Sequence, residues 1–318
     1  MSLKVVVGSR SKSRSKDAMK ILEDKGYIVE SNPFDRTMTE EELIERIKGA
    51  SALVAGSDKV TRRVLEAGKP TLKIVAKQGV GYNTIDIEAA KELGVAVTIT
   101  PGANSKSVAD LTIGLVLNAV RNISGMDRAI RNNKWYRYIG CELNNKIIGI
   151  VGMGHIGGEV AKRAYAFGMK ILAYDVYPRQ DFIEKYDVTY VNLEYLLKKS
   201  DIITLHAPAI KETENMINRD SINLMKSSAI LVNAARGELI NEDDLYEALK
   251  SKRIAFAALD VYQNEPLLNS KLTSLENIVF TAHAGAYTKE AIIGAGVIAS
   301  EEIVRVLSGE KAKFNVIK

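Results

Sequence analysis

The sequence is poor in the residues that form disulfides and transition-metal sites. Its 318 residues include one cysteine, Cys141, and three histidines. A single cysteine forms no internal disulfide, which favours a reducing compartment, and a solitary cysteine is more often inert than nucleophilic. Zinc sites need several His and Cys ligands, so we expect no metal site of that kind.

Long apolar runs are also missing. The longest, such as residues 229–232 and 292–299, are much shorter than the ~20 residues that a membrane-spanning helix needs. Residues 1–8 resemble a short strand followed by a basic polar segment, not the apolar core of a signal peptide. We therefore expect a cytoplasmic protein that does not associate with membranes.

The sequence also lacks a large excess of either positive or negative charge. The 44 basic and 39 acidic residues leave a net charge of +5, which attracts anionic substrates but does not define a nucleic-acid surface. The most basic stretch, residues 10–20, has two interpretations: a phosphate contact or, the favoured one, a solvated loop before the first helix. The sequence therefore predicts a small-molecule partner and no nucleic-acid partner.

Apolar runs of strand length alternate with helical patterns along most of the chain. Such alternation predicts an α/β fold with a parallel sheet and helices on both faces. The alternation breaks at residues 100–102, Thr-Pro-Gly, before a long helix at about 105–120, and it resumes at Lys146. We therefore predict two doubly wound parallel-sheet domains, 1–101 with 290–318, and 102–289. The last helix, roughly 289–307, is expected to return to the first domain.

Residues 146–175 contain the most specific motif. An apolar strand leads into Gly152, Gly154 and Gly157, which have the G-x-G-x-x-G spacing at the point where a strand becomes a helix. Such a turn lets the backbone approach a pyrophosphate, which then lies at the helix N-terminus. Asp175 ends the next strand, where a carboxylate can accept hydrogen bonds from a ribose 2′-OH. The arrangement predicts an NAD site.

Three charged residues follow later strands: Arg236, Glu265 and His283. Ligands of open α/β sheets bind beyond the carboxyl ends of the strands, so these residues are candidates for chemistry. On spacing alone, structural interpretations are equally good. They are an arginine paired with a surface acid, a glutamate that caps the turn before Pro266, and a satisfied buried histidine.

The segments that carry these residues resemble one enzyme family. The runs VGMGHIG, NAARGELINEDDL, ALDVYQNEP and TAHAGAYTKEA resemble, in order, the cofactor loop and the catalytic Arg, Glu and His segments of the D-isomer-specific 2-hydroxyacid dehydrogenases. KQGVGYNTID and PGANSKSVADLTIGLVL extend the resemblance over nearly the whole chain after about Leu72, and the phosphoglycerate dehydrogenase branch is the most similar. The resemblance implies a flavodoxin-like substrate domain, a Rossmann NAD-binding domain and a homodimer formed through the cofactor domain.

The resemblance also implies roles for the three strand-end residues. Arg236 binds the carboxylate and carbonyl oxygen of a 2-oxo acid, and His283 donates the proton. Glu265 orients the imidazole and favours its charged form. His206 follows the strand DIITL and is expected to line the cofactor pocket rather than act as the acid.

For the substrate, the resemblance points to the segment around Lys77. The amides of Val80 and Gly81 are expected to bind the substrate carboxylate, and Lys77 to meet a substrate phosphate. The family often has Arg at position 77, and it also differs from this chain at positions 83–84, 110 and 282. Because a lysine does not reproduce the bidentate fork of arginine, these departures weaken the choice of substrate.

The residues expected to contact NAD lie in the glycine loop and at the ends of later strands. They are Gly152, Gly154, His155, Ile156, Gly157, Asp175, His206, Pro208, Thr213, Ala234, Asp260 and Gly285.

The sequence thus predicts an NAD-dependent oxidoreductase that interconverts a small D-2-hydroxy acid, with 3-phosphoglycerate as a candidate, and its 2-oxo acid. The alternative is an NAD-binding sensor or corepressor on the same fold without significant turnover. Formate or phosphite oxidation is a third interpretation, for which the chain supplies no positive sign. The sequence ends shortly after the last predicted helix, so we expect no appended regulatory domain.

Overall fold

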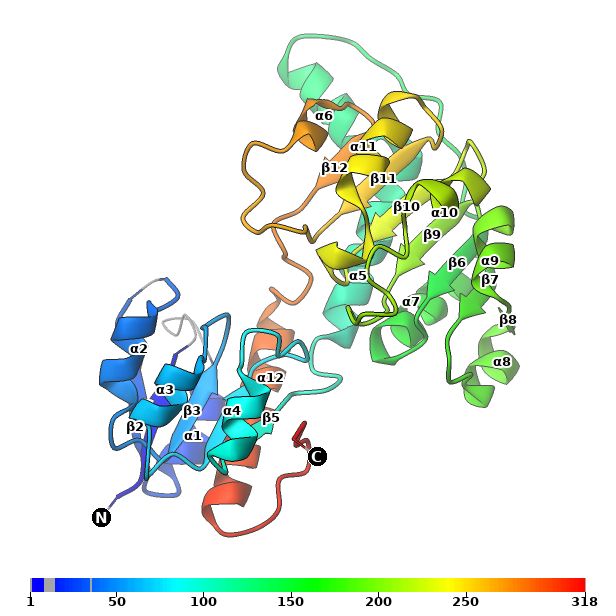
Figure 1. Ribbon diagram of the computed structural model, residues 1–318. Helices are drawn as coiled ribbons and strands as arrows, with labels where there is room; N and C mark the ends of the chain where they lie inside the picture. Colours follow the sequence, from blue (N-terminus) through cyan, green and yellow to red (C-terminus); the bar gives the residue numbers. More distant parts are fainter. Residues whose placement is uncertain (1, 9–14, 35, 318) are drawn as a thin grey trace. The chain divides into compact units, whose positions relative to one another are not determined.

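The computed structural model describes residues 2–8, 15–34 and 36–317 (Figure 1). The chain divides into two compact units: unit 1 comprises Met1–Asn104 and Tyr287–Lys318, and unit 2 comprises Ser105–Ala286. Residues 10–14 of the basic stretch discussed above lie outside the described residues. Unit 2 is continuous in sequence, whereas unit 1 is built from two separate segments.

Unit 1 is organised around a parallel sheet. Its strands are β1 (Lys4–Val7), β2 (Ile28–Ser31), β3 (Ala52–Ala55), β4 (Ile74–Lys77) and β5 (Ala96–Thr98). They lie in the order β2-β1-β3-β4-β5, and every neighbouring pair is parallel. This is the flavodoxin-like order. The central strands β3 and β4 are buried along their whole length, which explains their continuous apolar runs.

Helices cover both faces of this sheet. They are α1 (Lys16–Glu23), α2 (Glu40–Ile47), α3 (Arg62–Ala67), α4 (Ile87–Glu92) and α12 (Lys289–Leu307). On one face, α2, α3 and α4 contribute Leu43, Leu65 and Ala90 to the core. On the other face, α1 and α12 contribute Leu22 and Ile303. The last helix therefore packs in unit 1, against α1 and β4.

Unit 2 contains the longer sheet. Its strands are β6 (Ile147–Val151), β7 (Lys170–Tyr174), β8 (Val188–Tyr190), β9 (Ile202–Leu205), β10 (Ile230–Asn233), β11 (Phe256–Leu259) and β12 (Ile278–Phe280). They lie in the order β12-β11-β10-β9-β6-β7-β8, again all parallel. The order reverses between β6 and β9, and ligands of such sheets bind beyond the strand ends at this switch point. The predicted α/β doubly wound class is confirmed for both units.

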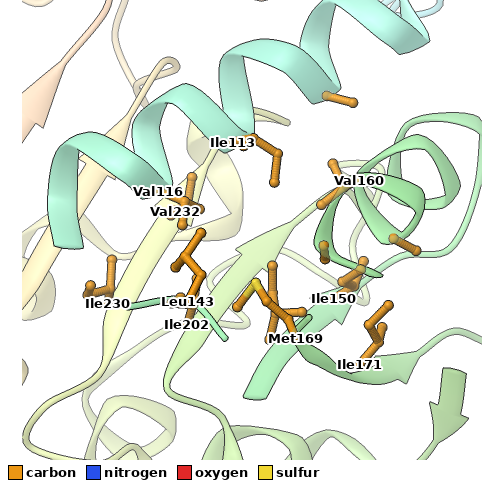
Figure 2. Close-up of a cluster of buried hydrophobic side chains, with 14 of the residues drawn as sticks. Ile113, Val116, Leu143, Ile150, Val160, Met169, Ile171, Ile202, Ile230 and Val232 are labelled. Carbon is orange, nitrogen blue, oxygen red and sulfur yellow. The ribbon is translucent and has the colours of Figure 1, made fainter. Parts of the chain in front are cut away.

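Helices of unit 2 lie on each face of the sheet. The helices of the unit are α5 (Ser105–Arg121), α6 (Ile123–Arg131), α7 (His155–Ala166), α8 (Gln180–Tyr186), α9 (Leu193–Lys199), α10 (Arg219–Leu224) and α11 (Glu242–Lys250), with short 3₁₀ turns η1 (Gly237–Leu239) and η2 (Lys271–Ser274). Of these, α6 buries none of its residues. Figure 2 shows Ile113 and Val116 of α5 and Val160 of α7 over Ile150 and Val232 of the sheet. The opposite face packs against α9, α10 and α11. None of the helices in the described ranges combines the length and the hydropathy of a membrane-spanning segment.

Candidate functional site

The glycine loop joins β6 to α7. Gly152 has a φ of +96°, and a Cβ there would lie 2.7 Å from the backbone nitrogen of Ala207, so this turn requires glycine. A Cβ on Gly157 would overlap the carbonyl oxygen of Gly152, which shows how closely α7 packs on the loop. A Cβ on Gly154, in contrast, would meet no atom within 4 Å. The loop is therefore tight at its base and open where a pyrophosphate has to approach.

The N-terminus of α7 has the properties of an anion site. Its N-cap is Gly154 and no side chain caps it, so first-turn N–H groups remain available to a ligand. Asp175, at the end of β7, accepts hydrogen bonds from the N–H of Met153 at 2.6 Å and of Tyr177 at 2.8 Å. Its carboxylate braces the loop and retains lone pairs for a ribose hydroxyl. These residues fit a bound NAD. The predicted contacts in the first turn are His155, which is exposed, and Ile156, which is half-buried.

His206 follows β9, on the other side of the switch point. Its N–H donates to the Val151 carbonyl at 2.7 Å, and its Nε2 lies 2.9 Å from the Thr204 hydroxyl. Its Nδ1 is buried and has no hydrogen-bond partner in the part of the chain that the structure describes. Burial lowers the pKa of this imidazole to about 3, so the ring is neutral near pH 7. Thr213 donates to the Pro208 carbonyl at 2.6 Å and closes the loop that follows.

Arg236 follows β10 and is half-buried. Its Nη1 donates to the Ala235 carbonyl at 2.6 Å, and within the described residues it forms no ion pair with a carboxylate. Asn233 holds this turn, because its Nδ2 donates to the Arg236 carbonyl at 2.8 Å and its Oδ1 accepts from the Ala235 N–H at 3.0 Å. Ala234, between them, is buried. The guanidinium is thus available to an anion.

Glu265 and His283 form a pair beyond β11 and β12. Glu265 Oε2 lies 2.7 Å from His283 Nδ1, and Oε1 accepts the Tyr262 N–H at 3.1 Å. The glutamate therefore caps a turn and orients an imidazole at the same time. The His283 side chain is 49% exposed, and its φ of +49° is uncommon outside glycine. The strands β10, β11 and β12 are neighbours in the sheet. Arg236, Glu265 and His283 therefore follow three adjacent strands.

Asp260 is a buried carboxylate at the end of β11. Its Oδ1 accepts from the Thr281 hydroxyl at 2.6 Å and the Ala284 N–H at 2.7 Å, and its Oδ2 accepts from the buried Gly285 N–H at 2.9 Å. Its main-chain carbonyl accepts the His283 N–H at 2.8 Å. A buried charge is tolerated only with such partners. The residue predicted to touch NAD thus also fixes the loop that carries His283.

In unit 1, the predicted substrate residues lie at and beyond the end of β4. Lys77 is 8% exposed, and its ammonium donates to the carbonyl of Gly56, just past β3. Because an ammonium has three N–H donors, this bond restrains Lys77 without using all of its donors. The N–H groups of Val80 and Gly81 have no hydrogen-bond acceptor among the residues described here. Adjacent unpaired amides in such a turn can bind a small anion.

Comparison with known proteins gives the family. Residues 113–285 match the NAD-binding domain of the D-isomer specific 2-hydroxyacid dehydrogenases. The chain belongs to this family. The D-3-phosphoglycerate dehydrogenase of Methanocaldococcus jannaschii is 46% identical over 305 residues, which cover 95% of this chain and 57% of that protein. The hydroxypyruvate reductase of Thermotoga maritima is 44% identical over 277 residues, which cover 85% of this chain and 89% of that protein.

A solved structure of the family agrees. The NAD⁺-bound 3-phosphoglycerate dehydrogenase of Entamoeba histolytica matches with a TM-score of 0.85 at 30% identity, covering 100% of this chain and 99% of that one. Unit 2 is therefore the NAD-binding domain of a D-2-hydroxyacid dehydrogenase family member, and the predictions of family and cofactor are confirmed. The chain spans little more than half of the archaeal phosphoglycerate dehydrogenase.

Sequence reasoning missed three residues that support the candidate site: Asn233, Gly237 and Tyr262. A Cβ on Gly237 would overlap the carbonyl group of Tyr262, so the turn after Arg236 packs directly on the turn that carries Glu265. A glycine immediately after a candidate arginine was an available signal for this close approach. The role of Tyr262 could not be predicted, because the partner of its hydroxyl lies 19 residues later and no local sequence pattern indicates it.

Proposed function

We propose that the protein is an NAD-dependent oxidoreductase that interconverts a small D-2-hydroxy acid and its 2-oxo acid. The observation that carries the proposal is the 2.7 Å contact between His283 Nδ1 and Glu265 Oε2 at the carboxyl edge of an NAD-binding sheet. A carboxylate beside an imidazole is the arrangement that a general acid needs. The bound cofactor supplies the hydride for reduction and accepts it for oxidation.

The chain's own residues supply the proton and the charge. In reduction, the carbonyl carbon gains the hydride and the carbonyl oxygen gains a proton from His283. Since Glu265 holds Nδ1, Nε2 is the nitrogen that gives this proton. Arg236 binds the substrate carboxylate and stabilises negative charge on the carbonyl oxygen. In unit 1, the unpaired amides of Val80 and Gly81 are proposed contacts of a carboxylate. Asp175 is the proposed ribose contact and should favour NAD over NADP.

As the substrate, we propose 3-phosphohydroxypyruvate, in the branch of the phosphoglycerate dehydrogenases. The names of the relatives above offer 3-phosphoglycerate and hydroxypyruvate, and the 2-oxo form of the first, 3-phosphohydroxypyruvate, differs from hydroxypyruvate by one phosphate. Lys77 is the proposed phosphate contact, as a point charge. We expect kcat/KM for 3-phosphohydroxypyruvate to exceed that for hydroxypyruvate by ~10-fold, the value of about one charged hydrogen bond.

Lys77→Met tests this choice. The change keeps an apolar stem and removes the ammonium, so it should erase most of the difference between the two substrates while sparing hydroxypyruvate. Lys73→Met, at an exposed lysine just before β4, is the matched control and should change neither value. Equal kcat/KM values in the parent protein would move the substrate to an unphosphorylated 2-oxo acid and leave the reaction class in place.

NADH oxidation separates the enzyme from the alternative, a sensor or corepressor, which none of the comparisons supports. The panel consists of 3-phosphohydroxypyruvate, hydroxypyruvate, glyoxylate and pyruvate. Turnover of any of them supports the oxidoreductase. Tight NADH binding with no turnover of the whole panel would instead support the sensor.

We also propose a homodimer formed through unit 2. Residues 123–139, which begin with α6, expose large apolar side chains: Ile123 is 51% exposed, Trp135 80% and Ile139 96%. The helix α6 buries none of its own residues. Apolar surface of this kind commonly marks an interface. Sedimentation at twice 34.9 kDa would support the dimer, and a monomer would contradict it. The free, exposed Cys141 supports a cytoplasmic location, where a thiol stays reduced.

A further inference from the structure

Tyr262 carries a hydroxyl that the proposed chemistry does not use. The residue lies just past β11, is buried, and packs its ring against Phe280 of β12 with the ring centroids 6.2 Å apart. Its hydroxyl lies 2.6 Å from the Thr281 carbonyl and 3.1 Å from the Leu259 carbonyl. One hydroxyl proton cannot serve both acceptors fully, and the shorter distance assigns it mainly to Thr281. The side chain thus joins the end of β12 to the turn after β11.

Thr281 passes this restraint on to His283, two residues later. The Thr281 hydroxyl donates to Asp260, and the same carboxylate accepts the N–H of Ala284 at 2.7 Å. The Asp260 carbonyl accepts the His283 N–H at 2.8 Å. These bonds bracket His283 on both sides. A histidine with a φ of +49° keeps that conformation only where its surroundings impose it.

The backbone of Tyr262 contacts the turns of Glu265 and Arg236. Its N–H donates to Glu265 Oε1, and the second oxygen of this glutamate lies against His283 Nδ1. A Cβ on Gly237, the residue after Arg236, would overlap the Tyr262 carbonyl group. Tyr262 therefore contacts the turns that carry all three candidate residues.

We propose that Tyr262 is a positioning residue whose hydroxyl fixes Thr281 and so sets the His283 imidazole against Glu265. The kinetic consequence rests on the proposed function, whereas the consequence for the imidazole rests on the geometry alone. Tyr262→Phe removes the hydroxyl and keeps the ring in its core contacts. In this variant the His283 imidazole should be held less firmly in place, whereas the cofactor loop should be unchanged.

The kinetic test compares Tyr262→Phe with a matched variant. We expect kcat for 2-oxo acid reduction to fall about tenfold, less than the ~10²-fold loss that a 1 Å misplacement can cause, with KM for NADH unchanged. Ser200→Ala is the control. It also removes a buried hydroxyl that donates to a carbonyl, that of Leu196 at 2.7 Å, but at the amino end of β9. It should leave kcat unchanged.

The deciding measurement needs no turnover. The sequence has three histidines, so ¹⁵N-histidine-labelled protein without cofactor gives three sets of imidazole signals, and His283→Asn assigns the set of interest. In Tyr262→Phe, the His283 Nδ1–H signal should move upfield and exchange faster with water, while the His206 signals stay in place. An unmoved His283 signal would overturn the proposal, as would an equal movement in Ser200→Ala. If the wild type reduced no 2-oxo acid, the proposed function would fail while this signal still decided the role of Tyr262.

Discussion

The ends of β9 and β12 each carry a histidine at the carboxyl edge of the same sheet, and the two rings have opposite surroundings. The Nδ1 of His206 is buried and has no hydrogen-bond partner among the residues that the structure describes, and burial lowers the pKa of the imidazole to about 3. The His283 side chain is 49% exposed, and its Nδ1 lies 2.7 Å from a carboxylate. A place at the sheet edge is therefore not enough for acid chemistry. A nearby carboxylate and access to water decide which ring can carry a proton.

The largest effect is expected when each of the two histidines is replaced in turn. His283→Ala should lower kcat for 2-oxo acid reduction by at least ~10²-fold, the typical contribution of a positioned general acid, and leave NADH affinity nearly unchanged. His206→Ala should have a much smaller effect on the chemical step, because a neutral imidazole is a far weaker acid than an imidazolium. Single-turnover rates and NADH titrations measure both quantities. The opposite order would transfer the role of acid to His206.

A second prediction concerns the carboxylate beside His283. Glu265→Gln keeps an acceptor for Nδ1–H but removes the negative charge beside the proposed proton donor. We expect kcat for 2-oxo acid reduction to fall, by less than in His283→Ala, with NADH affinity nearly unchanged. Single-turnover rates and NADH titrations measure both quantities. A kcat equal to that of the wild type would refute the proposed role of Glu265.

Near neutral pH the smallest effect is expected on stability, and it tests His206. The native ring has a pKa of about 3, whereas an ordinary imidazole has 6.5. Below pH 6.5 the unfolded chain binds a proton that the native ring does not, so the free energy of unfolding should fall by up to ~1.4 kcal/mol per pH unit until about pH 3. His206→Gln should flatten this dependence in urea titrations, and His155→Gln, at an exposed ring, should not. Equal slopes in wild type and His206→Gln would contradict the prediction, because they would mean that the native ring takes up its proton over the same pH range as the unfolded chain.

The fold was largely predictable because its signals are local. The alternation of strand and helix patterns, the glycines of residues 152–157 and the helix at 289–307 each occupy one continuous stretch. Even the first seventy residues, which carry no family motif, follow the predicted alternation. The strand order itself follows from the family resemblance and from the rules for parallel sheets.

The supports of the candidate site could not be predicted, because they join neighbouring strands. Asp260 is predicted to contact NAD, and nothing in its own segment indicates that its hydrogen-bond donors lie at residues 281–285. The hydroxyl of Tyr262 reaches the same segment. Lys77 is predicted to contact a phosphate, and no local pattern indicates that its ammonium also donates to the carbonyl of Gly56 on another turn. Each contact depends on strand register and on the path of a loop, which periodicity does not specify.

The division of the chain has a consequence for its synthesis. The ribosome completes every strand of unit 2 before it makes α12, which covers one face of the unit 1 sheet. Until then, apolar residues of β1, β3 and β4 on that face, such as Val5, Val54 and Ile74, lack part of their cover. During synthesis, unit 2 is therefore complete before unit 1. The sheet of unit 1, which is made first, stays exposed to chaperones and to self-association for the longest time.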